Sequence, residues 1–177
     1  MKHYRRIDTA SRFDTVIVAN GAFPKGEVAL AILRHARHVI ACDGVARTLL
    51  GQGFAPADIT VIGDGDSLGD ELKARLRFIR IAEQDSNDLT KATRHFAGLP
   101  TTSPGSRVAY LAATGKREDH TLANIALLMH YYREMDIQPV MVTDDGYFIP
   151  TDGDSSFETF VGQQVSIFNF GCRQLES

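Results

Sequence analysis

The chain has 177 residues, of which 44% are hydrophobic and 23% are charged, and this composition is typical of one soluble globular domain with part of a second. The formal net charge of −3 and the pI near 6.0 argue against a general nucleic-acid-binding protein, which usually has a basic face. No apolar run approaches the roughly 18 residues that a membrane-spanning helix needs. The basic residues at the N-terminus are not followed by the apolar stretch of a signal peptide.

The two cysteines, Cys42 and Cys172, are far apart in the sequence and lack the CxxC spacing of a zinc site or a redox pair. Thiols of this kind stay reduced in the cytoplasm. Together with the missing signal peptide, they predict a cytoplasmic protein. The net charge and the lack of a long apolar run predict that it binds neither nucleic acid nor membranes.

Short β-branched runs alternate with helical patterns over residues 1–143. In chain order, the pattern predicts strand 14–20, helix 26–36, strand 38–43, helix 45–53, strand 57–64, helix 68–76, strand 77–82, helix 86–98, strand 106–114, helix 118–135 and strand 137–145. This alternation implies βαβ crossovers and a mostly parallel sheet with helices on both faces. We therefore expect a Rossmann-like, three-layer α/β domain. In its longest helix, we expect an inward stripe of Leu122, Ile125, Ala126 and Met129.

After residue 144 the pattern changes to three short strand candidates, over residues 146–150, 156–162 and 163–171, with no helical period between them. They resemble the start of an antiparallel β unit, with too few strands to bury a face alone. We expect two units: an α/β domain at residues 1–143, and the beginning of an incomplete antiparallel β unit at residues 144–177.

Small, polar or charged residues follow five of the predicted strands. They are Asn20 and Gly21 after the first strand, Asp43 and Gly44 after the second, Asp64, Asp66 and Ser67 after the third, Asp85, Asp88 and Lys91 after the fourth, and Lys116, Arg117, Asp119 and His120 after the fifth. In open α/β sheets, ligands bind at the carboxyl ends of the strands. This one-sided clustering therefore predicts a binding site at that edge.

Several carboxylates with two or three cations suit a polyphosphate with Mg²⁺, because a hard cation relieves the repulsion between carboxylates. Asp64 and Asp66 are two residues apart on the exit from a strand, so their side chains can point the same way. Asp43 and Asp88 come from neighbouring strands and complete the predicted metal ligands. Taken singly, each aspartate could instead be a helix cap or a turn residue.

The cations of the site come from two helix starts. Lys91 lies one helical turn after Asp88, and Arg117 immediately precedes the longest helix, whose N-terminus favours an anion. His120 and Asn124 share one face of that helix and could contact a nucleotide, although Asp119 and His120 could also act as helix caps.

Competing motifs fail on spacing. A calcium loop that started at Asp64 would need an acid or amide at position five and Glu at position twelve, where the chain has Leu68 and Arg75. The chain contains no GxxxxGK[ST] phosphate loop and no GxSxG nucleophile elbow. For residues 61–70 a magnesium-binding pair remains, with Asp70 in the first turn of the next helix.

Four segments occur with a family-like order and spacing: "ACDGVARTLL", "ITVIGDGDSL", "EQDSNDLTKA" and "TGKREDHTLANI". Together they resemble the thiamine pyrophosphokinase family, over about residues 14–170. The resemblance implies an α/β catalytic domain, a β-sandwich that helps to bind thiamine, and a homodimer with active sites at the subunit interface. It implies Mg²⁺-dependent transfer of the pyrophosphoryl group of ATP to the thiamine hydroxyl, which gives thiamine diphosphate and AMP.

By position, the resemblance assigns roles to the residues at the sheet edge. The predicted catalytic residues are Asp64, Asp66, Asp88, Lys91 and Arg117, the metal ligands are Asp43, Asp64, Asp66 and Asp88, and the nucleotide- or substrate-binding residues are Asn20, Asp43, Gly44, Ser67, Asp119, His120 and Asn124. The chain departs from the family pattern at five positions, which are Val45, Arg47, Gly65, Asn87 and Lys116. The family's later strands are missing after Ser177, so we expect weak or no activity from this chain alone.

In the predicted mechanism, Mg²⁺ bridges ATP oxygens, Lys91 and Arg117 offset developing charge, and the thiamine hydroxyl attacks the β-phosphorus. One aspartate accepts the hydroxyl proton, and we favour Asp66. Two alternatives remain: a metal-dependent phosphoesterase and a non-catalytic nucleotide-binding domain.

Overall fold

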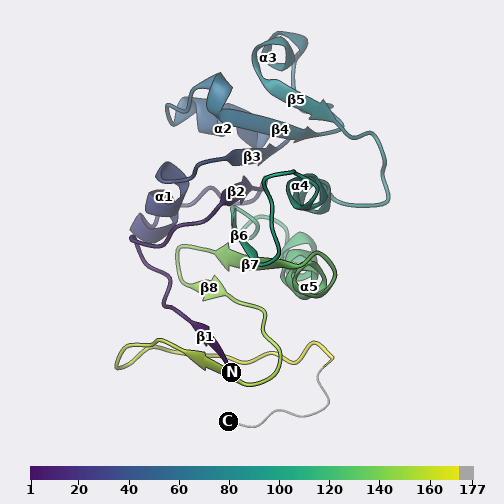
Figure 1. Cartoon of the computed structure of the whole chain (residues 1–177). Coiled ribbons are helices and arrows are strands. Elements are labelled where there is room, and N and C mark those ends of the chain that lie inside the picture. The colour runs from purple at the N-terminus through teal and green to yellow at the C-terminus, as the bar shows by residue number, and fades with distance from the viewer. Residues whose placement is uncertain (172–177) are drawn as a thin grey trace.

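A seven-stranded sheet forms the centre of the computed structural model, which describes residues 1–171 (Figure 1). The strand order is β5-β4-β3-β2-β6-β7-β8, where β2 to β7 are parallel and β8 pairs antiparallel with β7. The strands are β2 (Thr15–Val18), β3 (Val39–Cys42), β4 (Ile59–Gly63), β5 (Arg77–Arg80), β6 (Ser106–Leu111), β7 (Ile137–Val142) and β8 (Tyr147–Phe148). Each of the six predicted strands of the α/β domain is confirmed.

Helices cover both faces of the sheet. They are α1 (Glu27–Arg34), α2 (Val45–Gly51), α3 (Asp70–Arg75), α4 (Asp88–Ala97) and α5 (Glu118–Glu134), with a 3₁₀ turn, η1, at Pro56–Asp58. In Figure 1, α1 and α2 lie on one face and α4 and α5 on the other. Alternate residues of each strand point to opposite faces, so Val16 packs in the core under α1 and α2, whereas Ile17 packs under α4 and α5. The predicted three-layer α/β fold is confirmed.

The change of direction in strand order lies between β2 and β6, because β3, β4 and β5 continue on one side of β2 and β6 and β7 on the other. The chain segments after these two strands approach closely at Gly21, where a Cβ atom would lie 2.3 Å from the carbonyl oxygen of Ala112. Only glycine fits this approach. Such a switch point opens a crevice at the carboxyl edge of a sheet, where ligands bind in α/β folds.

The predicted inward stripe of α5 is correct only in part, because Ile125 packs partly buried against the core, whereas Leu122 and Ala126 are exposed. Leu122 is 68% exposed, and α5 instead buries Asn124, Leu128 and Tyr131. Two of these three residues carry polar groups, so the periodicity of apolar residues predicted the neighbouring stripe of the helix as the buried one. Their polar groups are buried because side chains of α4 and a carbonyl group after β6 supply the hydrogen bonds.

The C-terminal strands agree with the prediction in part: β8 lies within the predicted strand 146–150, and β9 overlaps the predicted strand 156–162. Strand β9 covers Ser155–Phe157 only, and residues 158–171 contain no strand. Strand β9 pairs in parallel with β1 (Lys2–Tyr4), a strand that the charged N-terminal sequence does not suggest. A strand forms only where a partner supplies its hydrogen bonds, and here the partner of β9 comes from the other end of the chain. Cys172 lies outside the described residues.

No helix in residues 1–171 combines the length and the apolar character required to cross a membrane.

Helix α1 is capped from a distant part of the chain. Gly26 at its N-cap offers no side chain, and the Asp144 carboxylate from the β7–β8 loop accepts hydrogen bonds from the backbone N–H groups of Lys25 (2.9 Å) and Gly26 (2.8 Å). A carboxylate here also interacts favourably with the helix dipole.

Asp144→Ala should therefore lower the free energy of unfolding by about 1 kcal/mol, measured by urea denaturation. The matched control is Asp145→Ala, because Asp145 is the next exposed aspartate and its carboxylate makes no hydrogen bond within the described residues. Equal stability of the two variants would contradict the capping role.

Candidate active site

Asp43 is a buried carboxylate at the carboxyl edge of the sheet. It directly follows β3, its side chain is largely buried, and its backbone φ of 41° lies in the left-handed region that aspartate tolerates better than most residues. Its Oδ2 atom accepts a hydrogen bond from the backbone N–H of Ser67 (3.2 Å). Its Oδ1 atom has no hydrogen-bond partner among the described residues. A buried carboxylate oxygen without a partner is costly, so Asp43 is suited to a cation or donor from outside the chain.

The loop after β4 presents Asp64 and Asp66. The backbone N–H of Asp66 donates to Asp64 Oδ1 (3.0 Å), and Gln84 Nε2 donates to Oδ2 (3.4 Å). These hydrogen bonds hold the pKa of Asp64 below its usual value, so Asp64 is ionised at neutral pH. The Asp66 side chain is exposed. Asp70 lies in the first turn of α3, as predicted.

Lys91 is a buried cation between these carboxylates. It is only 3% exposed, and its ammonium nitrogen lies 3.5 Å from Asp88 Oδ1. Burial raises the pKa of Asp88; the Lys91 charge opposes this shift, and the nearby Asp43 charge adds to it. The charge of Lys91 also contributes to the lowered pKa of Asp64. The structure therefore brings Asp43, Asp64, Asp88 and Lys91 together, in an arrangement that we call the acidic cluster.

Asn20, Gly44 and Ser67 lie side by side next to the acidic cluster. A Cβ atom on Gly44 would lie 3.3 Å from Ser67 Cβ and 3.4 Å from Asn20 Nδ2, so only a residue without a side chain leaves this space open. The ammonium group of Lys116 donates to the carbonyl oxygen of Asn20 (2.9 Å). This contact ties the β6–α5 loop to the end of β2.

Arg117, Asp119 and His120 form a separate, exposed group at the start of α5. Arg117 makes two hydrogen bonds to the Asp119 carboxylate, at 3.1 and 2.6 Å, and these bonds hold the pKa of Asp119 below its usual value. Arg117 occupies the N-cap position without a capping hydrogen bond of its own, and the Asp119 carboxylate accepts a hydrogen bond from the backbone N–H of His120 (2.9 Å) in the first turn. Among the described residues, no hydrogen bond or ion pair joins this group to the acidic cluster. Exposed ion pairs are weak, so Arg117 is able to exchange Asp119 for another anion.

The donors at this edge fit a magnesium ion. In residues 1–171, no group of three or more histidine, cysteine or acidic side chains is arranged to hold a metal by itself. Magnesium in nucleotide-binding sites usually takes one or two carboxylates, and water and phosphate oxygens supply the rest. The ionised Asp64, the exposed Asp66 and the unpartnered oxygen of Asp43 supply that kind of donor set.

Asn87, to which the sequence pattern assigned no site role, links α4 to α5. Asn87 Oδ1 caps α4 by accepting from the backbone N–H of Thr90 (2.9 Å), and its Nδ2 donates to Asn124 Oδ1 (3.1 Å). Asn124 Nδ2 donates in turn to the carbonyl oxygen of Ala113 (2.9 Å). The sequence signal was an asparagine immediately before the first helical residue, which is a common N-cap pattern.

Glu83 also belongs to the surroundings of the site. Its carboxylate accepts hydrogen bonds from the backbone N–H groups of Asp85 (2.7 Å) and Ser86 (3.0 Å) and from the Ser86 hydroxyl group. These bonds order the loop before α4 and hold the pKa of Glu83 below its usual value. No short motif marks such a loop in the sequence.

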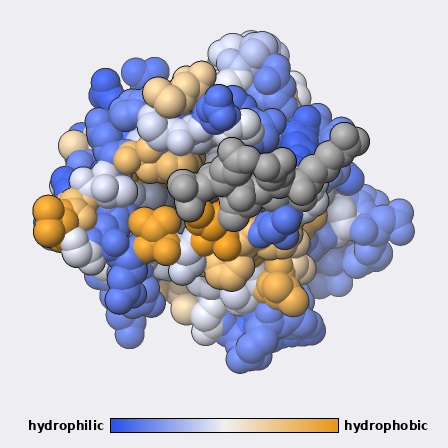
Figure 2. Space-filling view, turned by 90° about the horizontal axis from the view of Figure 1, so that it is seen from below, coloured by the Kyte–Doolittle hydropathy of each residue, from blue (hydrophilic) through white to orange (hydrophobic). Residues whose placement is uncertain are grey.

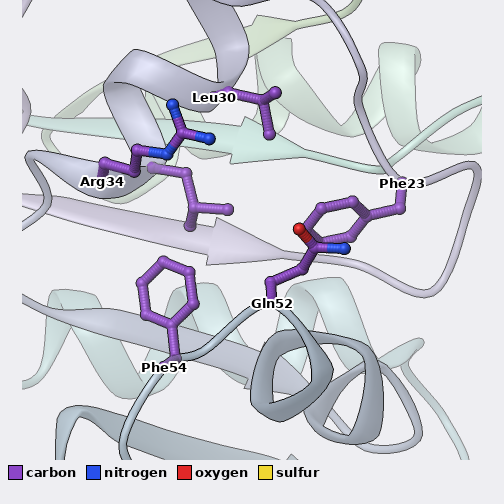
Figure 3. Close-up of a pocket in the computed structure, with 6 residues that line it drawn as sticks. Phe23, Leu30, Arg34, Gln52 and Phe54 are labelled. Carbon is purple, nitrogen blue, oxygen red and sulfur yellow. The ribbon is translucent and has the colours of Figure 1, made fainter.

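Two hollows in the molecule lie outside this edge. Figure 3 shows one of about 50 Å³ between α1 and α2, lined by Phe23, Leu30, Leu33, Arg34, Gln52 and Phe54. The second, of about 220 Å³, lies between the N-terminal segment, the start of β7 and the chain after β8. No predicted site residue lines either hollow, and both are smaller than a typical ligand pocket.

Comparisons with known proteins place the chain in a family. The model of the thiamin pyrophosphokinase catalytic domain matches residues 29–140, and the model of the thiamin pyrophosphokinase substrate-binding domain matches residues 146–177. A comparison with curated proteins gave no match.

Solved structures agree on the fold. Thiamin pyrophosphokinase from Candida albicans matches with a TM-score of 0.61 and 16% identity, covering 80% of this chain and 62% of that one. Thiamine pyrophosphokinase from Bacillus subtilis matches with a TM-score of 0.54 and 24% identity, covering 75% and 60%. Thiamin pyrophosphokinase from Geobacillus thermodenitrificans matches with a TM-score of 0.52 and 25% identity, covering 73% and 62%. The chain thus spans less than two thirds of each of these proteins, and it belongs to the thiamin pyrophosphokinase family.

Proposed function

We propose that the protein is a magnesium-dependent thiamine diphosphokinase, which transfers the pyrophosphoryl group of ATP to the hydroxyl group of thiamine and releases AMP. The observation that carries this proposal is the acidic cluster, in which buried Lys91 lies among three carboxylates at the carboxyl edge of the sheet. All four residues lie within the segment that matches the catalytic-domain model.

We assign the metal to Asp64 and Asp66, with Asp43 or Asp88 as a further ligand. When bound, Mg²⁺ neutralises charge on the phosphate oxygens. The chain's own contribution is to hold these carboxylates in place, through the Asp66 and Gln84 hydrogen bonds to Asp64 and the Ser67 hydrogen bond to Asp43.

Lys91 and Arg117 supply positive charge to the phosphates in two different ways. Lys91 is buried and held at the acidic cluster, so it acts as a preorganised charge and needs little reorganisation during transfer. Arg117 is exposed and paired with Asp119, so ATP would have to displace that carboxylate to gain the contact. Positioning and electrostatics supply most of the rate enhancement in phosphoryl transfer.

ATP contacts are proposed for the residues around the acidic cluster, namely Asn20, Asp43, Gly44, Ser67, Asp119 and His120, with Asn124 behind them. Gly44 keeps the space next to Ser67 open. Asn124 is buried and its amide group bonds to Ala113 and Asn87, so we propose that it orients the start of α5 for the nucleotide.

Asp66 is the proposed acceptor of the thiamine hydroxyl proton. Its side chain is exposed at the site and makes no hydrogen bond within residues 1–171. Asp66→Ala should therefore abolish turnover and leave the free energy of unfolding within about 0.5 kcal/mol of the parent value. The control is Asp70→Ala, which removes an exposed aspartate four residues further along, in the first turn of α3. Substantial activity of Asp66→Ala would exclude Asp66 from the mechanism.

The decisive assay incubates the full-length protein with ATP, Mg²⁺ and thiamine and measures AMP. AMP that forms only when thiamine is present supports the proposal. Release of phosphate without thiamine would instead indicate the phosphoesterase, and ATP binding without turnover would indicate a non-catalytic nucleotide-binding domain. Omission of Mg²⁺ should abolish AMP formation, and full activity in excess EDTA would contradict metal dependence.

The domain division, the homodimer and the cytoplasmic location extend this proposal. The two family models meet between residues 140 and 146, which supports a catalytic unit at residues 1–143 and a thiamine-binding unit that begins at residue 144.

Exposed apolar side chains support a partner surface: Leu122 is 68% exposed, Val161 is fully exposed, and Figure 2 shows apolar groups on the face seen from below. Cys42 is a buried, free thiol, which suits a reducing compartment. A single-chain mass in light scattering would contradict the homodimer.

A further inference from the structure

Three polar pairs join one face of α4 to the elements packed against it. Asn87, Thr90 and Thr93 are spaced three residues apart, so their side chains lie along that face. The pairs are Asn87 Nδ2 to Asn124 Oδ1 at 3.1 Å, Thr90 Oγ1 to Tyr131 Oη at 2.7 Å, and Thr93 Oγ1 to Tyr110 Oη at 2.9 Å. The two threonine pairs are buried between α4, α5 and β6, and the asparagine pair lies at the end of α4 that carries the acidic cluster.

The asparagine pair belongs to a continuous chain of hydrogen bonds. Asn87 Oδ1 holds the backbone N–H of Thr90 in the first turn of α4, Asn87 Nδ2 donates to Asn124, and Asn124 Nδ2 donates to the carbonyl oxygen of Ala113 after β6. In residues 1–171, no other hydrogen bond or ion pair joins the first turn of α4 to residues 113–124. The Asn87–Asn124 pair is therefore the polar link between these two parts of the site.

The two parts carry different halves of the positive charge. The first turn of α4 holds Lys91 with Asp88, whereas the chain after Ala113 holds Lys116 and Arg117. A nucleoside triphosphate bound at this edge would need both halves at a fixed separation, because an error of about 1 Å in the placement of reacting groups can lower a rate by roughly 100-fold.

We propose that the Asn87–Asn124 pair is a positioning element, which holds the Lys91 half and the Arg117 half of the site in register for the triphosphate. This inference rests on the proposed function. Asparagine at position 87 both accepts at the helix cap and donates to α5. Serine caps a helix about as well but is one bond shorter, so it would keep the cap and lose the link.

The test compares Asn87→Ser with Thr90→Val, which removes the neighbouring pair to Tyr131 but leaves the link to Asn124 intact. Asn87→Ser should lower the free energy of unfolding by about 1 kcal/mol, because it leaves Oδ1 of the buried Asn124 without its partner. It should lower kcat for thiamine-dependent AMP formation at least about tenfold, with little change in the KM for thiamine. Thr90→Val should lower stability and keep kcat. A parent-like kcat for Asn87→Ser, or an equal loss of kcat in Thr90→Val, would overturn the proposal.

A second measurement does not depend on turnover. Asn87→Ser should accelerate hydrogen exchange at the amides of residues 120–124 at least about tenfold and leave those around Tyr131 unchanged, because only the link at the start of α5 is lost. Unchanged exchange at residues 120–124 would overturn the positioning role even if the parent protein proved to lack thiamine-dependent activity. Absence of that activity with accelerated exchange would instead reject the proposed function and retain the link.

Discussion

Replacement of Asp43 by asparagine is expected to lower thiamine-dependent AMP formation by at least about 100-fold and to leave the free energy of unfolding unchanged or higher. Asparagine tolerates the φ of 41° as well as aspartate does, and its amide oxygen can still accept from the backbone N–H of Ser67. What the variant loses is the charge of a buried carboxylate whose Oδ1 atom has no partner within the described chain. Removing a charge that is unsatisfied in the free protein but needed in the complex should lower activity without lowering stability.

Two measurements check the Asp43 result. Urea denaturation gives the stability, and the AMP assay gives the rate. NMR titration of Asp88 adds an independent readout: the Asp43 charge contributes to the raised pKa of Asp88, so Asp43→Asn should lower the pKa of Asp88. An active Asp43→Asn variant, or a variant that loses activity because it unfolds, would contradict the assignment.

Lys91→Met is expected to lower kcat by about 100- to 1,000-fold, the usual effect of removing one preorganised charge from a transition state. Methionine keeps the apolar stem of a side chain that is only 3% exposed, so the packing of α4 should survive. The control is Arg94→Met, one turn further along α4, where an exposed cation pairs with Glu83. A loss of activity in both variants would indicate a general effect of charge rather than a role for Lys91.

Lys91→Met should also change how the free energy of unfolding depends on pH. Burial raises the pKa of Asp88, so between its ordinary and its raised pKa the folded state binds more protons than the unfolded state. The free energy of unfolding therefore falls as pH rises through this window. Lys91 opposes the shift, so Lys91→Met should raise the pKa of Asp88 further and extend the fall to higher pH. A pKa of Asp88 that stays the same would show that the two groups do not interact in solution.

The sequence alone determined the order of strands and helices in the α/β domain and the edge at which its polar residues gather. Each predicted strand from residue 14 to residue 145 overlaps an observed strand, because buried parallel strands are short, continuous apolar runs. The residues that follow these runs were predictable as a group, since parallel strands bring their carboxyl ends to one edge. The pairing of Lys91 with Asp88 was also predictable, because only one helical turn separates the two residues.

The tertiary structure decided which of these residues meet and which polar groups are satisfied. It placed Lys91 within the acidic cluster and left Arg117 with Asp119 on the exposed rim. It also turned α5 so that Asn124 and Tyr131 face inward. Apolar periodicity could not predict this face, because a buried polar side chain is stable only when a partner from another segment bonds to it. For Asn124 that partner is Asn87, 37 residues away in the chain, and only folding brings the two together.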